Sequence, residues 1–99
     1  MTITKQLSGN TLTVAIEGRL DTLTAPELEA ELKTSLEGVN SLVMDFTKLD
    51  YVSSAGLRVL LSTHKAMQGK GGMKITHIND IVREVFEVTG FSSILNIED

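Results

Sequence analysis

The fold is decided by residues 42–57, which read LVMDFTKLDYVSSAGL. The opening segment, 42–46, is too short for a helix and apolar on both faces, which predicts a central parallel strand. Side chains at helical spacing then form one apolar stripe, which consists of Leu57, Leu60, Leu61, His64 and Met67. This pattern predicts a helix that begins near Ser53 or Ser54 and ends at the glycine-rich turn 69–72.

Two strands are predicted near the start of the chain. Residues 11–17 alternate between apolar and polar side chains, which is typical of a half-buried strand, and residues 3–7 match the same pattern more weakly. Between them, Ser8-Gly9-Asn10 supplies residue types that tolerate positive φ. We therefore expect a hairpin with a tight three-residue connection.

A first helix is predicted after Gly18. Thr24 and Glu27 fit a capping box, in which the Thr24 hydroxyl would accept a hydrogen bond from a backbone N–H and Glu27 would reach back. The apolar side of this helix consists of Leu28, Leu32 and Leu36. Gly38 is well placed to be the left-handed residue beyond its end.

A further strand and a last helix are predicted downstream. The strand covers residues 73–78, and either Asn79 or Asp80 can cap the helix that follows. The expected buried face of that helix consists of Val82, Val85, Phe86 and Thr89. We expect Gly90 to end it and Phe91 to fold back over the final turn.

The order of these elements predicts an α/β fold with a single domain over residues 1–99. Two strands precede alternating helices and strands, and residues 94–97 add one more strand or a turn. This order predicts a mixed four- to five-stranded sheet with parallel crossovers and helices packed on it. The loop after the second strand and the loop after Phe46 should then emerge at one end of the sheet, which would make Asp21 and Ser54 neighbours.

Composition limits the kinds of partner. The chain has 9 Lys and Arg against 13 Asp and Glu, a formal charge of −4, and no basic run, which argues against nucleic-acid binding. With no cysteine it has neither disulfides nor thiolate metal sites. Residues 1–7 lack the pattern of a signal peptide, and no apolar stretch approaches the roughly 20 residues of a membrane span. We expect a cytoplasmic protein that does not associate with membranes.

Few residues could support catalysis. His64 and His77 are the two histidines, and neither has a second metal ligand at helical spacing, so we expect no metal site. Ser54 and Gly56 form half of a G-x-S-x-G nucleophile elbow, but Val52 stands where its first glycine would be. We therefore expect no enzymatic activity and no cofactor.

The serine pair at the start of the second helix has two interpretations. One serine can simply cap the helix, which contributes about 1 kcal/mol. Alternatively, the first N–H groups of the helix can accommodate a phosphoryl group, so a phosphorylated serine would cost the fold little. Arg58, one turn beyond Ser54, could partly neutralise that group or could be an ordinary solvated side chain.

Three blocks of the chain resemble the anti-sigma factor antagonists, a bacterial family of STAS domains. The most specific block joins residues 42–46 and Tyr51-Val52 to Ser53-Ser54-Ala55-Gly56-Leu57. Gly18-Arg19-Leu20-Asp21 and the helix 81–91, with its Gly90-Phe91 ending, support it. The resemblance extends over nearly the whole chain.

The resemblance implies a phosphorylation-dependent partner switch that regulates transcription. In that family an anti-sigma factor, itself an ATP-dependent serine kinase, phosphorylates a serine at the position of Ser54, and a serine phosphatase reverses the step. The unphosphorylated protein binds the kinase and frees its sigma factor. We expect a monomer in which Asp21, Ser53, Ser54, Gly56 and Arg58 bind the partner.

Two alternatives remain open. The family motif often has Asp at the position of Ser53 and a hydroxyl residue at that of Ala55, so Ser53 is a competing phosphate acceptor. Alternatively, the chain is a STAS module that docks constitutively in another bacterial assembly, such as a transporter accessory or a signalling scaffold. In that case Ser54 would be only a helix cap.

Overall fold

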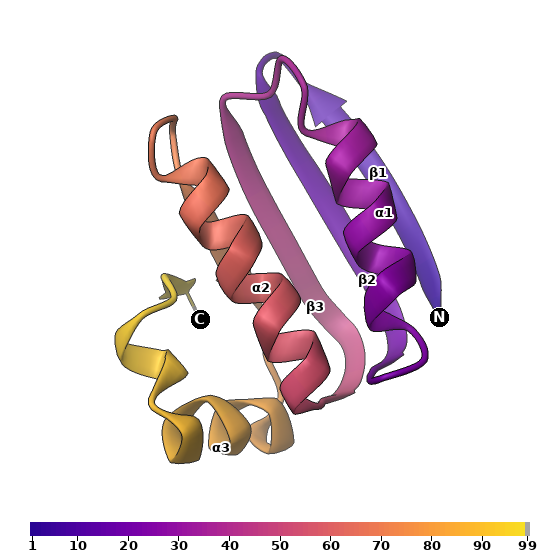
Figure 1. Ribbon diagram of the computed structural model, residues 1–99, viewed down its shortest axis with the longest axis vertical. Coiled ribbons are helices and arrows are strands. Elements are labelled where there is room, and N and C mark those ends of the chain that lie inside the picture. Colours follow the sequence, from indigo (N-terminus) through magenta and orange to yellow (C-terminus); the bar gives the residue numbers. More distant parts are fainter. Residues whose placement is uncertain (99) are drawn as a thin grey trace.

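The computed structural model describes residues 1–98, which form a five-stranded sheet with three α-helices packed on it (Figure 1). The strands are β1 (Thr2–Ser8), β2 (Thr11–Leu20), β3 (Ser41–Val52), β4 (Met73–Thr76) and β5 (Ile97–Glu98). The helices are α1 (Ala25–Ser35), α2 (Ser54–Met67) and α3 (Asp80–Thr89), followed by a 3₁₀ turn at Phe91–Ser93. The strands lie in the order β1-β2-β3-β4-β5, with β1 antiparallel to β2 and the other pairs parallel. The predicted mixed sheet is confirmed.

The helices leave one face of the sheet uncovered. Each parallel crossover advances by one strand in the same direction, and right-handed connections of this kind place their helices on the same side. The core therefore lies between that side and the helices, and β3 alternates buried Leu42, Met44 and Phe46 with partly exposed Val43 and Asp45. The predicted central parallel strand is confirmed, because β3 pairs in parallel with β2 and β4. Only one of its faces is buried, although residues 42–44 are apolar on both.

β3 is also much longer than predicted. The expected strand over residues 42–46 continues to Val52, and its pairing with β2 shifts register twice. Near the first shift, Thr47 and Lys48 are both exposed, which breaks the alternation that marks a strand in a sequence. β3 stays paired with β2 beyond these irregularities and ends at Val52, directly before the serine pair.

The predicted hairpin between β1 and β2 is present, but its turn is shorter than expected. Ser8 pairs with Thr11, so the connection is the two residues Gly9-Asn10 and not three. Of these two residues only Gly9 has a positive φ, at 60°. This pattern is typical of a type II′ turn, whose twist matches that of the flanking strands.

The helix ends mostly follow the sequence signals. Gly38 and Gly90 have the predicted left-handed φ values of 78° and 82°. Asn79 is the N-cap of α3, and its side chain accepts a hydrogen bond from the Val82 N–H at 2.7 Å. Leu28 and Leu32 of α1 are buried, as predicted.

Two residues near α3 differ from prediction. Thr89 is exposed, and its hydroxyl donates to the Val85 carbonyl at 2.6 Å, so the buried side chains of α3 are Val82 and Phe86. His77 lies beyond the end of β4 with a φ of 61°, outside the strand in which it was expected.

Candidate functional site

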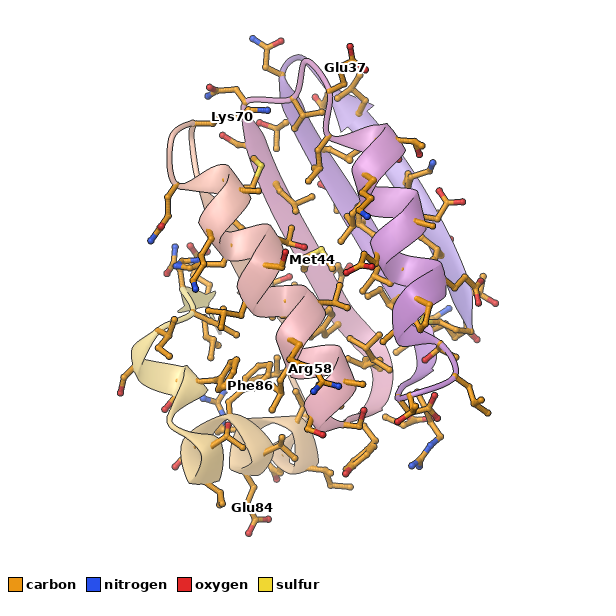
Figure 2. The ribbon with its side chains drawn as sticks, viewed as in Figure 1. Glu37, Met44, Arg58, Lys70, Glu84 and Phe86 are labelled. Carbon is orange, nitrogen blue, oxygen red and sulfur yellow. The ribbon has the colours of Figure 1, made fainter. Side chains whose placement is uncertain are left out.

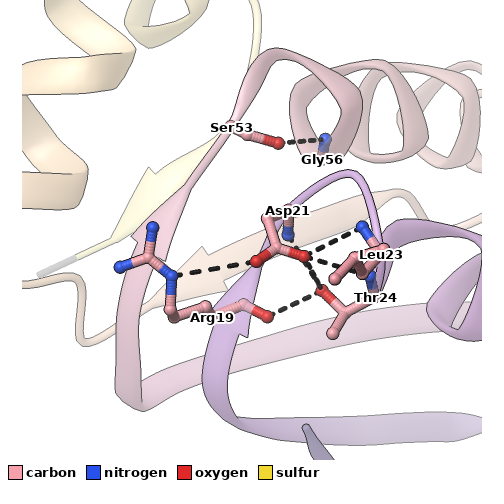
Figure 3. Close-up of polar contacts among 6 residues, drawn as sticks. All are labelled: Arg19, Asp21, Leu23, Thr24, Ser53 and Gly56. Carbon is pink, nitrogen blue, oxygen red and sulfur yellow. Dashed lines mark hydrogen bonds and ion pairs between the residues drawn. The ribbon is translucent and has the colours of Figure 1, made fainter.

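The carboxyl ends of β2 and β3 meet at one edge of the sheet. Leu20 pairs with Val52 at the last position of both strands, and the Ser53 N–H donates to the Leu20 carbonyl at 2.8 Å. The loop that begins at Asp21 therefore lies beside the start of α2 (Figure 3). The structure brings together the two segments that the parallel crossover predicted to be neighbours.

The two serines of the pair have different environments. Ser53 is the N-cap of α2: its backbone is extended, and its hydroxyl oxygen accepts from the Gly56 N–H at 3.4 Å. Ser54 is the first residue of the helix, and its side chain is exposed. The first turn of α2 contains no acidic residue, so no carboxylate of the helix itself offsets the partial positive charge at this end.

Gly56 lies at the closest approach of α2 to β2. A Cβ at this position would lie 2.7 Å from the Leu20 Cγ and 3.0 Å from the Leu20 carbonyl oxygen. Leu20 has no exposed surface and cannot move away. Gly56 is itself buried, and its close packing sets the distance between the serine pair and the Asp21 loop.

The Asp21 loop is closed by its own hydrogen bonds (Figure 3). One Asp21 carboxylate oxygen accepts from the N–H groups of Leu23 and Thr24 at 3.0 and 3.1 Å. The Thr24 hydroxyl accepts from the Asp21 N–H at 2.8 Å and donates to the Arg19 carbonyl at 2.7 Å. The predicted capping box was wrong, because this hydroxyl bonds backwards into the loop and makes no cap hydrogen bond to α1.

The hydrogen bonds stabilise the charged form of Asp21. The Thr24 N–H lowers the pKa of this carboxyl most, while partial desolvation acts in the opposite direction. The Leu23 N–H, the Thr24 hydroxyl and the nearby Arg19 lower the pKa further. Asp21 is therefore a fixed negative charge beside the serine pair at neutral pH.

Arg19 and Tyr51 lie beside Asp21 at the ends of β2 and β3, and the sequence analysis did not identify them as site residues. They pair across β2 and β3, and the Arg19 guanidinium lies 4.7 Å from the centre of the Tyr51 ring. The Arg19 Nε is also 3.8 Å from the second Asp21 carboxylate oxygen. No local pattern connects residues 32 positions apart, and only the β2–β3 register could have identified this contact.

Arg58 lies one turn beyond Ser54 on α2 and is exposed (Figure 2). Within residues 1–98 it forms no ion pair or hydrogen bond through its side chain. Its guanidinium is therefore available to an anion at the start of the helix.

The histidines do not assemble a site with other ligands. The Nδ1 of His64 is buried without a hydrogen-bond partner, and the Nδ1 of His77 lies 3.7 Å from an Asp45 carboxylate oxygen. No group of three or more His, Cys, Asp or Glu side chains that could hold a metal ion occurs in residues 1–98. None of the helices in this part of the chain has the length and apolarity needed to cross a membrane.

Comparisons with known proteins identify the family. The STAS domain model matches residues 2–99. BtrV of Bordetella bronchiseptica, named as an anti-sigma factor antagonist, is 37% identical over 98% of this chain and 85% of its own length. The anti-sigma-B factor antagonist of Staphylococcus aureus is 29% identical over 87% of this chain and 82% of its own.

Solved structures share the fold. An anti-sigma factor antagonist from Thermotoga maritima superposes with a TM-score of 0.90 at 17% identity, covering 98% of this chain and 86% of that one. The unphosphorylated form of the antagonist SpoIIAA gives 0.82 at 18% identity over 99% of this chain and 89% of that one. The phosphorylated form, from Bacillus, gives 0.74 at 17% identity over 99% and 92%. The chain therefore belongs to the STAS domain family, among the bacterial anti-sigma factor antagonists.

Proposed function

We propose that this chain is a partner switch controlled by phosphorylation of Ser54. Unphosphorylated, it binds an anti-sigma factor that is an ATP-dependent serine kinase, and the sigma factor is released. A serine phosphatase removes the phosphoryl group and restores binding. One observation carries the proposal: the Ser54 side chain is exposed at the start of α2, while the neighbouring Ser53 hydroxyl is occupied as the helix cap.

The family consists of non-enzymatic regulators, so the chain is the substrate of the transfer and not its catalyst. In the proposed step the Ser54 hydroxyl oxygen forms a bond to the γ-phosphorus of ATP as the bond to ADP breaks, and the hydroxyl proton leaves to a base of the kinase. The kinase also supplies the nucleotide site. This chain contributes the position of Ser54, whose backbone is held at the start of α2 by the helix cap and by the close packing of Gly56 on Leu20.

The start of α2 favours the product. A phosphoryl group carries a charge of about −1.5 to −2 at neutral pH. A negative charge at a helix N-terminus is stabilised by about 0.3–1 kcal/mol. The first turn of α2 has no acidic residue that would already neutralise the positive end of the helix dipole. The serine at position 53, where the family often has aspartate, removes one further source of repulsion. Arg58 is placed to add a cation.

The same charge weakens partner binding. Asp21 already contributes a carboxylate to this edge of the sheet, and Asp50 is exposed on β3 nearby in the sequence. A kinase that has just transferred its phosphoryl group holds ADP, whose phosphates face the new dianion. Like charges repel strongly in an interface from which water is excluded, and this repulsion lowers the affinity for the kinase. The phosphorylated chain therefore dissociates.

Phosphorylation can be tested directly. Each anti-sigma factor kinase encoded in the source genome is expressed and incubated with the chain and ATP, and intact mass is followed by fragmentation. We expect one phosphoryl group on Ser54, lost in Ser54→Ala and retained in the matched control Ser53→Ala. A phosphoryl group that maps to Ser53, or that persists in Ser54→Ala, would contradict the assignment.

The charge mechanism needs a separate test. Ser54→Asp and Ser54→Asn have nearly the same shape and differ in one negative charge, so their affinities for the kinase isolate the electrostatic effect. We expect weaker binding of Ser54→Asp than of Ser54→Asn. Equal affinities of both variants and the wild type would favour constitutive docking instead.

The same proposal places the chain in the cytoplasm as a monomer, where ATP, the kinase and the phosphatase are available. The sigma factor itself is not contacted by this chain: its release follows from competition for the kinase. Size-exclusion chromatography with light scattering tests the monomeric state.

A further inference from the structure

Large apolar side chains are exposed at the end of the molecule that carries Ser54. Leu23 has 87% of its surface exposed, Ile81 58% and Val88 80%. Within residues 1–98, the other exposed large hydrophobic residues are Leu7 and Ile94. Leu7 lies beside the β1–β2 turn, at the opposite end of the long strands. Exposed apolar side chains gathered near one site are typical of a protein interface.

The topology places these side chains on both sides of Ser54. β2, β3 and β4 are parallel neighbours, so the segments after their carboxyl ends lie along one edge of the sheet in the same order. Leu23 follows β2, Ser54 follows β3, and α3 follows β4. Two hydrogen bonds join these segments: Ser53 N–H to the Leu20 carbonyl at 2.8 Å, and Asn79 Nδ2 to the Leu49 carbonyl at 3.0 Å.

α3 presents an apolar outer face. Figure 2 shows Phe86 turned towards α2 and Glu84 turned away from the body of the molecule. Ile81 and Val88 lie three residues before and four residues after Glu84, so they share its face. A shallow depression of about 290 Å³ on this face is lined by Ile81, Glu84, Val85, Val88 and Thr89.

Both apolar elements are held in place before any partner binds. The Leu23 N–H is bonded to the Asp21 carboxylate, which fixes the backbone that carries the exposed side chain. α3 is anchored by Phe86, which has no exposed surface, and by the Asn79 cap. Little backbone entropy is then lost on binding, which favours these side chains as binding anchors.

Carboxylates border the apolar side chains. Asp80 and Glu84 are exposed on α3, Asp50 is exposed on β3, and Asp21 lies two residues before Leu23. A complementary partner surface has apolar pockets bordered by lysine or arginine side chains. The net charge of −4 favours a basic partner of this kind over a second copy of the chain, which carries the same net charge.

We propose that Leu23 and the α3 face formed by Ile81, Val85 and Val88 are two apolar anchors that flank Ser54 and bind the anti-sigma factor kinase. The inference rests on the proposed function and identifies the surface that supplies the affinity. The anchors hold the kinase on either side, and Ser54 between them meets the nucleotide. Phosphorylation then acts on the centre of the interface and leaves the anchors unchanged.

The experiment measures the affinity of the kinase selected by the phosphorylation assay, loaded with ADP, by isothermal titration calorimetry. The variants are Leu23→Ala and the double variant Ile81→Ala with Val88→Ala, and the matched control is Leu7→Ala at the opposite end. Alanine is the better helix former, so α3 should remain folded, and thermal unfolding of each variant checks this. We expect each anchor variant to bind at least about tenfold more weakly, the size of effect expected of interface anchors.

The outcomes separate the two proposals. Weak binding of both anchor variants with unchanged binding of Leu7→Ala supports the anchors. Wild-type affinity in either folded anchor variant overturns that anchor, while Ser54 phosphorylation and the difference between Ser54→Asp and Ser54→Asn still stand. Equal loss in Leu7→Ala also overturns the proposal, because the effect is then not specific to this surface. If no kinase binds the wild-type chain, both the anchors and the proposed function are refuted.

Discussion

Replacing Gly56 with alanine is expected to destabilise the fold, although the same change in an exposed helix would stabilise it. The new Cβ would lie 2.7 Å from the Cγ of Leu20 and 3.0 Å from its carbonyl oxygen. Overpacking of this kind costs about 1–3 kcal/mol. Leu20 is fully buried and its carbonyl accepts the Ser53 N–H, so a shift of its side chain or its carbonyl would disturb the core or break this hydrogen bond. We therefore expect a cost in the upper half of that range.

Helix propensity acts in the opposite direction. Alanine is favoured over glycine in a helix by about 1 kcal/mol, so the expected net loss is about 1–2 kcal/mol. For a chain of this size that corresponds to a fall in the melting temperature of about 4–8 °C per kcal/mol. Urea unfolding followed by circular dichroism gives the free energy of unfolding.

Gly69→Ala is the matched control. A Cβ at Gly69 meets nothing within 4 Å, and its backbone is not left-handed, so this variant should be neutral or slightly more stable than the wild type. If Gly56→Ala is as stable as the wild type, α2 does not approach β2 as closely as the geometry requires. The positioning of the serine pair by Gly56 is then refuted.

Three further predictions concern stability. Phe86→Ala should lower the free energy of unfolding by about 3–5 kcal/mol because Phe86 is fully buried, whereas Val88→Ala on the exposed face of the same helix should change it by less than about 0.5 kcal/mol. Asn79→Ala should cost about 0.5–2 kcal/mol, measured by urea unfolding, because the side chain caps α3 and also donates to a β3 carbonyl; no loss would show that neither bond stabilises the fold. The pKa of Asp21 is lowered in the folded chain, chiefly by the Thr24 N–H, so its contribution is fully present above the ordinary value of 3.8 and is lost as the pH falls through the folded-state pKa. Unfolding experiments below about pH 4 should therefore show a weaker pH dependence in Asp21→Asn than in the wild type, and parallel curves would contradict the loop geometry.

The sequence predicted the elements whose signals are local. The two helix starts depend on hydrogen bonds that span only a few residues, so spacing identified them to within one position, near Ser53 or Ser54 and near Asn79 or Asp80. The left-handed residues Gly38 and Gly90 are equally local. The Thr24 capping box was equally local and wrong. The Thr24 hydroxyl had several backbone groups within hydrogen-bond distance, and residue spacing does not show which of them it binds.

The length of β3 could not be predicted, because its register shifts interrupt the alternation and only pairing with β2 restores it. The sequence by itself determined that two strands would deliver Asp21 and the serine pair to one end of the sheet, since parallel crossovers leave no other arrangement. The tertiary structure alone decided how closely α2 approaches Leu20, and that Leu23 and α3 flank Ser54. These features depend on contacts between residues about 30 positions or more apart, whose geometry is set by strand pairing and core packing and by no local preference of the chain.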